Sequence, residues 1–401
     1  MADLISIAEA QRLVLERTKA LDAERVPIER ASGRVLAEPA TAVVDLPPFP
    51  SSAMDGYALR SGDTGDAPVT LPVVERIAAG RPASRALRAG EAMAIATGGA
   101  VPEGADAVIQ LENVEETEAG LVVSEPVPTG TNVRGRGGDV RAGEGVLEAG
   151  ARLGAAQVAA LAAAGIAEVR CTKRPRVGIL VTGSELRPPG EQLREGEIYE
   201  SNGLLLATAL GAAGAVPAQL GIVADDPEEH RRTMERALLG FDMLVTSGGA
   251  SVGPHDLVRE VQRELRVEEV FWGVAVKPGK PVAFGVRRDH LVFNLPGNPV
   301  SVLVTFELFV RPAVNALLGA PDPLPAFQQG TLAAAVRRNP HRDELLRAVA
   351  KRDNATVALD PVPGQDSHMI VRAGQATALV LVEAGEGEVP AGATVSFLPL
   401  S

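Results

Sequence analysis

The stretch "RVGILVTGSEL" (residues 176–186) begins the part of the chain that decides the fold. Its first half is an apolar run of the length of a buried strand, and a glycine turn follows directly. The same order of strand, glycine-rich turn and helix then recurs. Strands are predicted at 177–181, 216–223, 242–246 and 281–293, and helices at 203–213, 227–239, 254–265 and 299–318. This alternation predicts a mostly parallel sheet with helices on both faces.

The segments on either side follow other patterns and predict a multidomain protein, as expected for 401 residues. Two helices are predicted, at 7–21 and 150–168, with short alternating β runs between them. After Pro325 only β patterns remain, so we expect a small C-terminal β-barrel. The predicted domains are a helical or mixed one, an inserted β domain, an α/β domain and a C-terminal β domain, at 1–40 with 141–170, 41–140, 171–325 and 326–401.

Composition and charge argue against several classes of function. The formal net charge of -12 argues against nucleic acid or an anionic membrane as a partner. Cys171 is the only cysteine, so neither an intrachain disulfide nor a thiolate zinc site can form. The N-terminus lacks an apolar signal core, and the apolar stretches 155–167 and 299–310 are interrupted by Gln157 and Glu307. We therefore expect a soluble cytoplasmic protein.

The stretch "VTSGGASVGPHD" (245–256) places small polar residues where a predicted strand ends. Ligands gather at the carboxyl ends of strands in open α/β sheets. Glycines let backbone N–H groups approach a ligand closely, and the serine hydroxyls can donate hydrogen bonds. Asp256, near the next helix start, is either a helix cap or a carboxylate of a metal or phosphate site.

Two further motifs at strand ends are candidates for anion binding. In "KPGKPVAFG" (277–285), Lys277 and Lys280 flank a Pro-Gly turn, so both amines can converge on one anion. The spacing is not that of a Walker A loop. In "NLPGNPVS" (294–301), Asn298 and the following proline form a typical helix start, which serves either as a simple cap or as a second anion site.

Carboxylates accompany these motifs. Glu185, Asp225 and Asp256 are expected at the same edge of the sheet, where magnesium would use one or two carboxylates plus substrate phosphates. Alternatively, one aspartate of the pair 225–226 only caps a helix. In the β region, Asp55 belongs either to a plain Asp-Gly turn or to a site. The stretch "TNVRGRGGDV" (131–140) is either an anion site or a hinge.

Together these motifs resemble the MoeA family of molybdopterin molybdenumtransferases, which also includes the E domain of gephyrin. The motifs that carry the resemblance are "SAMDGYA", "TGGAVPEGADAV", "NVRGRGGD", "VTGSEL", "IYESN", "TSGGASVGPHD", "KPGKPVAFG" and "LPGNPVS", spread over essentially the whole chain. The resemblance implies four domains, with an α/β domain similar to MogA and MoaB. It also implies that molybdate is inserted into adenylylated molybdopterin with release of AMP and a requirement for Mg²⁺.

The resemblance assigns roles to individual residues. The implied substrate-binding residues are Ser247, Gly248, Gly249, Ser251, Gly253, Lys277, Lys280, Pro296, Gly297, Asn298 and, in the C-terminal domain, Ser367. The implied catalytic residues are Asp55, Thr97, Asp139, Glu185, Asp225 and Asp256, and the last three are also the candidate metal ligands. Gly273, Gly138 and Asn294 stand where relatives commonly carry a basic, an acidic and a small residue, which puts individual contacts in question.

The polar motifs fall into two groups, one in the β region (within 51–139) and one in the α/β region (182–301). A symmetric homodimer would let one subunit's β domain reach its partner's α/β cleft, and the resemblance implies the same shared active site. It further implies a MogA-like adenylyltransferase and molybdoenzymes as partners. Two alternatives are a MogA-like adenylyltransferase and a gephyrin-like scaffold without enzymatic activity. Tungstate is an alternative oxyanion.

Overall fold

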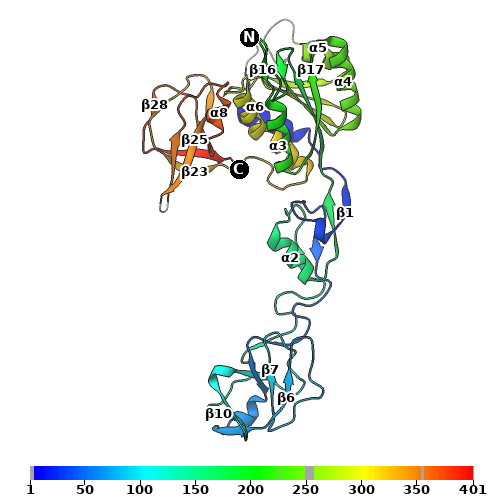
Figure 1. Ribbon diagram of the computed structural model, residues 1–401, viewed down its shortest axis with the longest axis vertical. Coiled ribbons are helices and arrows are strands. Elements are labelled where there is room, and N and C mark those ends of the chain that lie inside the picture. The colour runs from blue at the N-terminus through cyan, green and yellow to red at the C-terminus, as the bar shows by residue number, and fades with distance from the viewer. Residues whose placement is uncertain (1–3, 225, 249–256, 354–355, 401) are drawn as a thin grey trace. The chain divides into compact units, whose positions relative to one another are not determined.

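The computed structural model of the protein describes residues 4–224, 226–248, 257–353 and 356–400. Within these residues the chain forms two compact units (Figure 1). The first unit contains residues 4–24, 33–37 and 171–400, and the second contains residues 25–32 and 38–170. The helices predicted near 7–21 and 150–168 therefore belong to different units. The four predicted domain boundaries stay a prediction.

The α/β part of the first unit is built on a six-stranded sheet in the order β17-β14-β18-β22-β21-β19. The strands β17 (Val216–Val223), β14 (Arg176–Thr182), β18 (Met243–Ser247) and β22 (His290–Leu295) pair in parallel. Strand β21 (Ala283–Arg287) pairs antiparallel with β22, and β19 (Glu268–Trp272) pairs antiparallel with β21. The mostly parallel sheet is thus confirmed. The segment predicted at 281–293 is two antiparallel strands, which meet at a tight turn where Arg288 has a φ of 58°.

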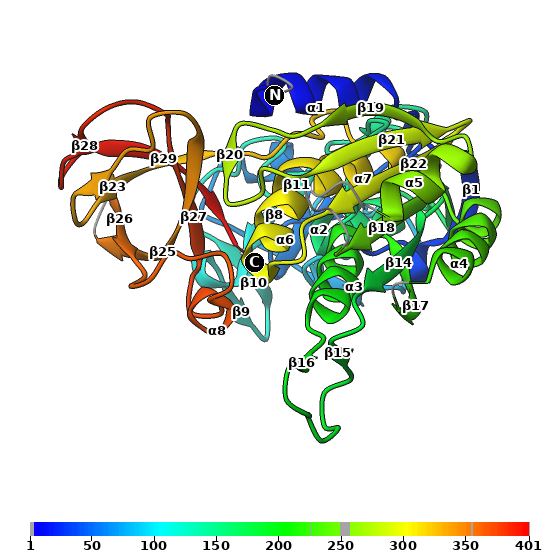
Figure 2. The same cartoon turned by 90° about the horizontal axis from the view of Figure 1, so that it is seen from above.

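Helices cover both faces of this sheet (Figure 2). On one face, α1 (Ile7–Glu16), α3 (Asn202–Ala213) and the helical segment 299–317 share a buried cluster with strand residues such as Ile179. On the other face, α4 (Pro227–Gly240) and α5 (Leu257–Glu264) pack on intervening residues such as Leu180. Neighbouring residues of a strand point to opposite faces, so a strand covered on both sides reads as a continuous apolar run.

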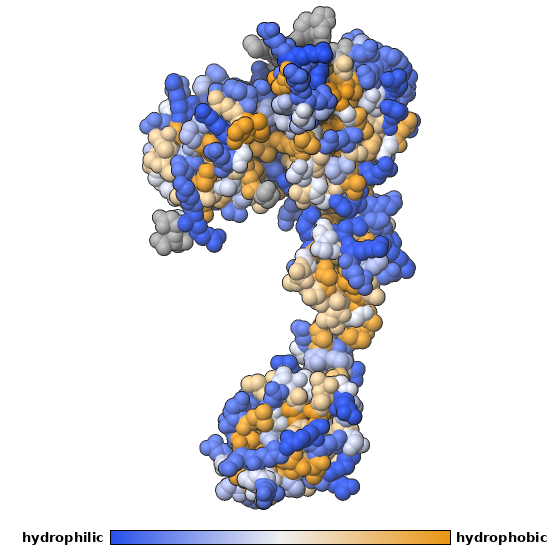
Figure 3. Space-filling view, viewed as in Figure 1, coloured by the Kyte–Doolittle hydropathy of each residue, from blue (hydrophilic) through white to orange (hydrophobic). Residues whose placement is uncertain are grey.

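The helical segment 299–317 consists of α6 (Pro299–Thr305), a π-helical turn (Phe306–Val310) and α7 (Arg311–Leu317). Within the described residues it is the one helix long and apolar enough to cross a membrane, but 78% of that stretch is buried inside the protein. Its Glu307 pairs with Arg311 at 2.6 Å. The segment therefore packs as a core helix. Hydrophilic and hydrophobic residues are intermixed on the visible surface of this unit (Figure 3).

The C-terminal part of the first unit is a closed five-stranded barrel, as predicted. Its strands follow one another in the order β25 (Asp343–Asp353), β26 (Thr356–Pro361), β23 (Gln328–Leu332), β29 (Thr394–Pro399) and β27 (Ala378–Val382), and β27 pairs back with β25. Strand β20 (Val276–Lys277) adds to β25 from the α/β part. The last helix, α8 (Ile370–Ala373), follows a loop that returns toward the α/β part (Figure 2).

The second unit is rich in β structure, as predicted for 41–140. Its larger sheets are β6-β7-β4-β8 and β5-β10-β9, formed by β4 (Gly56–Leu59), β5 (Val69–Leu71), β6 (Val73–Ile77), β7 (Ala92–Ile95), β8 (Ala107–Gln110), β9 (Glu115–Thr117) and β10 (Gly120–Val123). Both predicted outer helices are shorter than expected. Helix α1 ends at Glu16, and α2 (Ala155–Ala163) ends just before Gly165, which has a φ of +81°.

Candidate active site

A pocket of about 890 Å³ opens at the carboxyl ends of β14, β18 and β22, where the sequence predicts a ligand site. Predicted site residues that line it are Glu185, Ser247, Gly248, Lys280, Pro296, Gly297 and Asn298. The pocket is also lined by Glu200, Asn202 and His368, which the sequence analysis did not select. Segments far apart in the chain therefore converge on one cavity at the edge of the sheet.

Ser247 anchors one wall of this pocket. Its Oγ accepts a hydrogen bond from Asn202 Nδ2 at 2.9 Å and donates to the Pro296 carbonyl at 3.2 Å. Asn202 Nδ2 also donates to the Gly297 carbonyl at 2.7 Å. The buried Asn202 Oδ1 accepts no hydrogen bond from a described residue. Buried acceptors are rarely left without a donor, so this oxygen marks a place for water or a polar ligand.

Gly248 and Asn294 have clear local reasons. A Cβ at Gly248 would lie 2.3 Å from the Thr182 carbonyl oxygen, so only glycine fits this turn. Asn294 is buried and bonds Gln262 through both ends of its amide, at 2.6 and 2.9 Å. Its Oδ1 also accepts from the Thr246 hydroxyl at 2.9 Å. Asn294 thus belongs to a buried hydrogen-bond network, which gives the amide at this position a structural role.

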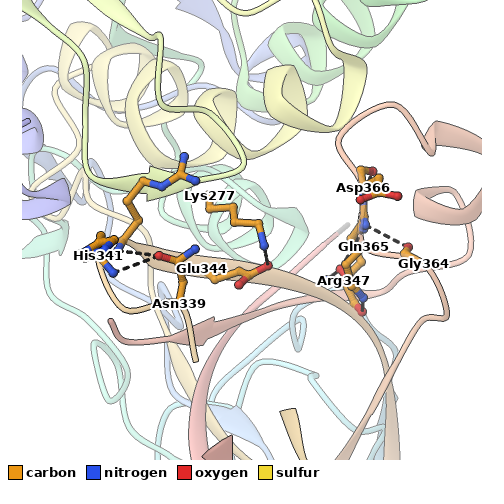
Figure 4. A network of polar contacts seen from close by, with 9 residues as sticks. Lys277, Asn339, His341, Glu344, Arg347, Gly364, Gln365 and Asp366 are labelled. Atoms are coloured by element: carbon orange, nitrogen blue, oxygen red, sulfur yellow. Dashed lines mark hydrogen bonds and ion pairs between the residues drawn. The ribbon is translucent and has the colours of Figure 1, made fainter. Parts of the chain in front are cut away.

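Of the two lysines predicted to converge on one anion, one lines the pocket and the other has a carboxylate partner in the barrel. Lys280 lines the pocket, but the Lys277 amine pairs with Glu344 of β25 at 3.0 Å (Figure 4). The Glu344 side chain is only 8% exposed, so a buried carboxylate holds the Lys277 amine. A role for Lys277 in substrate binding stays a prediction. Gly273 directly follows β19 and has a φ of +86°, and a Cβ there would meet Leu4 Cδ2 at 2.8 Å. The left-handed backbone gives the main reason for the glycine, because a residue with a side chain is strained there.

Asn298 occupies the N-cap position of α6, as predicted, but its side chain does not cap the helix. Instead, Asn298 Nδ2 donates to Ser367 Oγ at 2.8 Å. The backbone N–H of Val300 donates to the Ser367 carbonyl at 3.0 Å. The helix start is thus partly satisfied by Ser367 rather than left open for an anion. The bond to Asn298, which lines the pocket, places Ser367 beside the other predicted substrate-binding residues.

A buried arginine holds the loop that carries Ser367 (Figure 4). Arg347, on β25, is 1% exposed. Its guanidinium donates to Gln365 Oε1 at 3.1 Å and to the carbonyls of Asp366 and Gly364, both at 3.0 Å. Burial lowers the pKa of Arg347. Arg347 is not among the residues predicted from the sequence, where its one signal is a lone arginine inside the apolar run "LLRAVA".

The predicted metal ligands are only partly described. Glu185 is exposed at the pocket, and its carboxylate lies over Gly183, where a Cβ would be 2.7 Å from Glu185 Oε2. Asp225 and Asp256 lie outside the described residues. Among the described residues, no group of three or more His, Cys, Asp or Glu side chains could hold a metal ion. Of the predicted glycine-serine loop, Gly249, Ser251 and Gly253 also lie outside the described residues.

The β-rich unit brings together two of its three predicted catalytic residues. Asp55 Oδ1 accepts hydrogen bonds from the backbone N–H of Thr97 at 2.6 Å and from its hydroxyl at 3.0 Å. These two donors, the backbone N–H first, lower the pKa of the Asp55 carboxyl. Asp139 is exposed, and its backbone N–H donates to the Leu46 carbonyl at 2.9 Å. The nearby Arg136 pairs with Asp45 at 2.5 Å.

Replacing Thr97 with valine should raise the pKa of Asp55 toward its ordinary value. Thr97→Val removes the hydroxyl donor and keeps the backbone donor, so the shift should be partly lost. Because the pKa of Asp55 is lowered in the folded protein, its ionised carboxylate stabilises the fold at pH values above the ordinary pKa of an aspartate. This stabilisation is lost as the pH falls through the pKa that Asp55 has in the folded protein. NMR titration of the Asp55 carboxyl carbon measures the change. Thr97→Ser keeps the hydroxyl and should keep the wild-type midpoint. An unchanged midpoint in Thr97→Val would show that the Thr97 hydroxyl does not lower the pKa of Asp55.

The three parts of the chain match known families over nearly their whole length. Residues 5–165 match the family described as MoeA N-terminal region (domain I and II). Residues 178–316 match a probable molybdopterin binding domain, and residues 329–400 match the MoeA C-terminal region (domain IV). The order of the matches follows the order of the β-rich unit, the α/β part and the barrel.

Full-length relatives agree with these matches. The chain is 35% identical to molybdopterin molybdenumtransferase 2 of Mycobacterium tuberculosis, over 99% of this chain and 100% of that protein. It is 34% identical to the molybdopterin molybdenumtransferase of Haemophilus influenzae, over 99% of each chain. The crystal structure of a molybdopterin biosynthesis MoeA protein from Pyrococcus horikoshii is similar, with a TM-score of 0.86, 31% identity and coverage of 99% of this chain and 100% of that chain.

The fold and the pocket define a class: multidomain proteins with a molybdopterin-binding α/β domain between a β-rich N-terminal region and a small C-terminal barrel. The chain belongs to the MoeA family of molybdopterin molybdenumtransferases. It is accordingly an enzyme that inserts molybdenum into molybdopterin, with molybdate and molybdopterin as substrates. The full-length matches favour this function over a separate adenylyltransferase or a scaffold without enzymatic activity.

Proposed function

We propose that the enzyme acts on adenylylated molybdopterin, inserts molybdate into its dithiolene and releases AMP. The observation that carries this proposal is the pocket itself. An amine, a glycine turn and polar side chains meet there at the ends of parallel strands, through Lys280, Gly248, Ser247 and Asn298. Such a pocket suits a ligand with several anionic groups. Tungstate is the alternative oxyanion.

We further propose that the reaction depends on Mg²⁺. The donor chemistry of the described residues fits this ion in one respect, because Glu185 presents a carboxylate at the pocket and Mg²⁺ prefers oxygen ligands. Asp225 and Asp256 are the other proposed ligands. A bound Mg²⁺ would neutralise phosphate charge. The contribution of this chain is to hold the phosphates with Lys280 and to orient the substrate against the wall formed by Ser247 and Asn298.

The proposed assembly is a homodimer with a shared active site. Its support is that Asp55 and Thr97 belong to one compact unit, whereas Glu185 and Lys280 belong to the other. We propose that the two groups act on one substrate across the dimer. We also place the enzyme in the cytoplasm, where a MogA-like adenylyltransferase would supply its substrate and molybdoenzymes would receive its product.

AMP release tests the proposed reaction directly. The purified protein is incubated with adenylylated molybdopterin, molybdate and Mg²⁺, and AMP is followed by chromatography. AMP should appear only when molybdate and Mg²⁺ are both present, and tungstate replaces molybdate in a parallel reaction. Chelation of the metal should stop release, and added Mg²⁺ should restore it. Absence of AMP in the complete reaction would contradict the proposed substrate.

Replacing Lys280 with alanine should weaken binding of the adenylylated pterin by about one to two decades. A hydrogen bond to a charged group contributes roughly 1.5–3 kcal/mol, and 1.4 kcal/mol corresponds to a factor of ten. Calorimetric titration measures the loss. Lys351→Ala is the matched control, because Lys351 is an exposed lysine of the barrel that pairs with Asp360 at 3.2 Å. Equal affinity of Lys280→Ala and the wild type would show that the Lys280 amine is only solvated.

A further inference from the structure

The π-helical turn in the segment 299–317 is an irregularity that the pocket residues do not explain. The backbone N–H of Arg311 donates to the carbonyl of Phe306, five residues earlier, whereas a regular α-helix uses the carbonyl four residues earlier. The Glu307 carboxylate and the Arg311 guanidinium bridge this turn with hydrogen bonds of 2.6 and 2.7 Å. One extra residue is therefore accommodated between α6 and α7, and turns of this kind are frequent at functional sites.

Pro312 accounts for the irregularity. It is the second residue of α7. In an unbroken α-helix, residue 312 would donate its N–H to the carbonyl of residue 308, but proline has no N–H and its ring crowds that carbonyl. Leu308 is fully buried. The sequence therefore creates a carbonyl acceptor inside the protein that needs a donor from another element.

Gln11 of α1 supplies the missing donor. Its Nε2 donates to the Leu308 carbonyl at 3.0 Å. Helix α1 packs against the π-helical turn and α7, and the residues before it are fixed by a backbone hydrogen bond of 2.8 Å from Ala275 to the Ile5 carbonyl. A side-chain amide on a fixed helix thus replaces a backbone N–H of the neighbouring helix.

Helix α6 connects this turn to the pocket. Its N-cap residue Asn298 lines the pocket. Its last residue, Thr305, lies against the loop that carries Lys280, because a Cβ at Gly279 would be 2.7 Å from Thr305 Cγ2. If the π-helical turn closed into a regular α-helix, the loss of one residue would rotate α6 by roughly 100° about its axis. Both contacts therefore depend on the turn.

We propose that Gln11 is a positioning residue for the reaction. By holding the Leu308 carbonyl it maintains the π-helical turn, and the turn directs α6 so that Asn298 and the loop of Lys280 face the pocket. Gln11 is not among the residues that line this pocket, so it acts only through the helix. Its effect on the reaction rests on the proposed function, in which Lys280 and Asn298 hold the substrate.

Hydrogen exchange in the full chain tests the positioning without a substrate. Gln11→Leu removes the amide donor and should accelerate exchange of the hydrogen-bonded amides of Val300 and Val302, at the start of α6, by about tenfold. Exchange in β14 should stay unchanged, which distinguishes movement of α6 from a loss of global stability. Gln329→Leu is the matched control, because it removes an exposed amide bond of 3.1 Å to Ser396 in the barrel, and it should exchange as the wild type does.

A change at Pro312 makes the test specific. Pro312→Ala supplies a backbone N–H for the Leu308 carbonyl, so the Gln11 amide should matter little in that background. Exchange at the start of α6 in the double variant Gln11→Leu/Pro312→Ala should then stay within about twofold of that in Pro312→Ala alone. Equal acceleration by Gln11→Leu in both backgrounds would overturn the proposal, as would unchanged exchange in Gln11→Leu itself.

The effect on the reaction is measured separately. The displaced groups bind the substrate in the ground state and the transition state alike, so Gln11→Leu should raise the KM for adenylylated molybdopterin by about 3- to 10-fold and leave kcat close to that of the wild type. The Pro312→Ala background should remove this difference. An unchanged KM beside faster exchange would overturn the role of Gln11 in the reaction. Failure of the wild type to release AMP would instead contradict the proposed substrate, and the exchange comparison would still decide the positioning.

Discussion

Mixing two inactive variants, Asp55→Ala and Glu185→Ala, should restore about one quarter of wild-type AMP release if subunits exchange and sites are shared. Random exchange makes about half of the dimers mixed, and each mixed dimer then contains one intact site of two. The physical reason is that Asp55 and Glu185 belong to different compact units, so a shared site would take one from each subunit. The measurement is the rate of AMP release before and after exchange.

The control for this experiment is a mixture in which both changes lie in the same unit. Asp55 and Thr97 are joined by hydrogen bonds of 2.6 and 3.0 Å, so Asp55→Ala and Thr97→Ala damage the same half of the site. Their mixture should restore no activity, because each site of a mixed dimer keeps one damaged half. If exchange is demonstrated and the first mixture is equally inactive, the shared-site arrangement is wrong.

Replacing Arg347 with methionine should destabilise the loop that carries Ser367 and lower kcat/KM by about 10- to 100-fold. The change keeps a long apolar stem but leaves the carbonyls of Gly364 and Asp366 without their donor, while Gln365 Oε1 keeps only its bond from the backbone N–H of residue 347. Each of the two carbonyls that lose their donor would cost about 1–3 kcal/mol if water were excluded, and water reaches this half-exposed loop in part, so local stability should fall by about 2–4 kcal/mol. Hydrogen exchange of the amides at 364–369 measures this local loss.

The site should respond because Ser367 bonds both Asn298 and the start of α6. Arg347→Lys is an informative second variant: it keeps a positive charge but has one compact donor group instead of a planar fork, so it should restore little. Lys351→Met is the control, because Lys351 lies on the same strand, is exposed and pairs with Asp360, so exchange at 364–369 should stay unchanged. Wild-type exchange in Arg347→Met would refute this role for the arginine.

The sequence predicts the sheet and the barrel well because their signals are local. Strands such as β14 (Arg176–Thr182) are continuous apolar runs, and glycine turns mark where they end. The sequence predicts one β segment at 281–293 and not the hairpin of β21 and β22, because the turn at Arg288 contains no glycine or proline. Strand β19, which begins with two glutamates at 268–269, lacks a clear alternating pattern and was not predicted.

The sequence predicts site residues that belong to a motif within one segment. It does not predict contacts between residues that are far apart in the chain. Ser247, Gly248, Lys280 and Asn298 follow strand ends and line the pocket as expected. No local pattern could show that Glu344 holds the Lys277 amine, or that Ser367 reaches Asn298, because these partners are brought together only by the barrel. Glu200 was overlooked for a related reason: its burial depends on how α3 packs beside β14.

Strand β17 contains a glycine bulge at Gly221, which has a φ of 97° and lies where the register of β17 against β14 shifts. In the described sheet, β17 is an edge strand with β14 as its neighbour on one side. The free edge of a strand is a template for pairing with another chain, and bulges and prolines interrupt such pairing. Strand β17 has both, in Gly221 and Pro217. The irregular backbone of this edge strand thus disfavours edge-to-edge pairing with another chain.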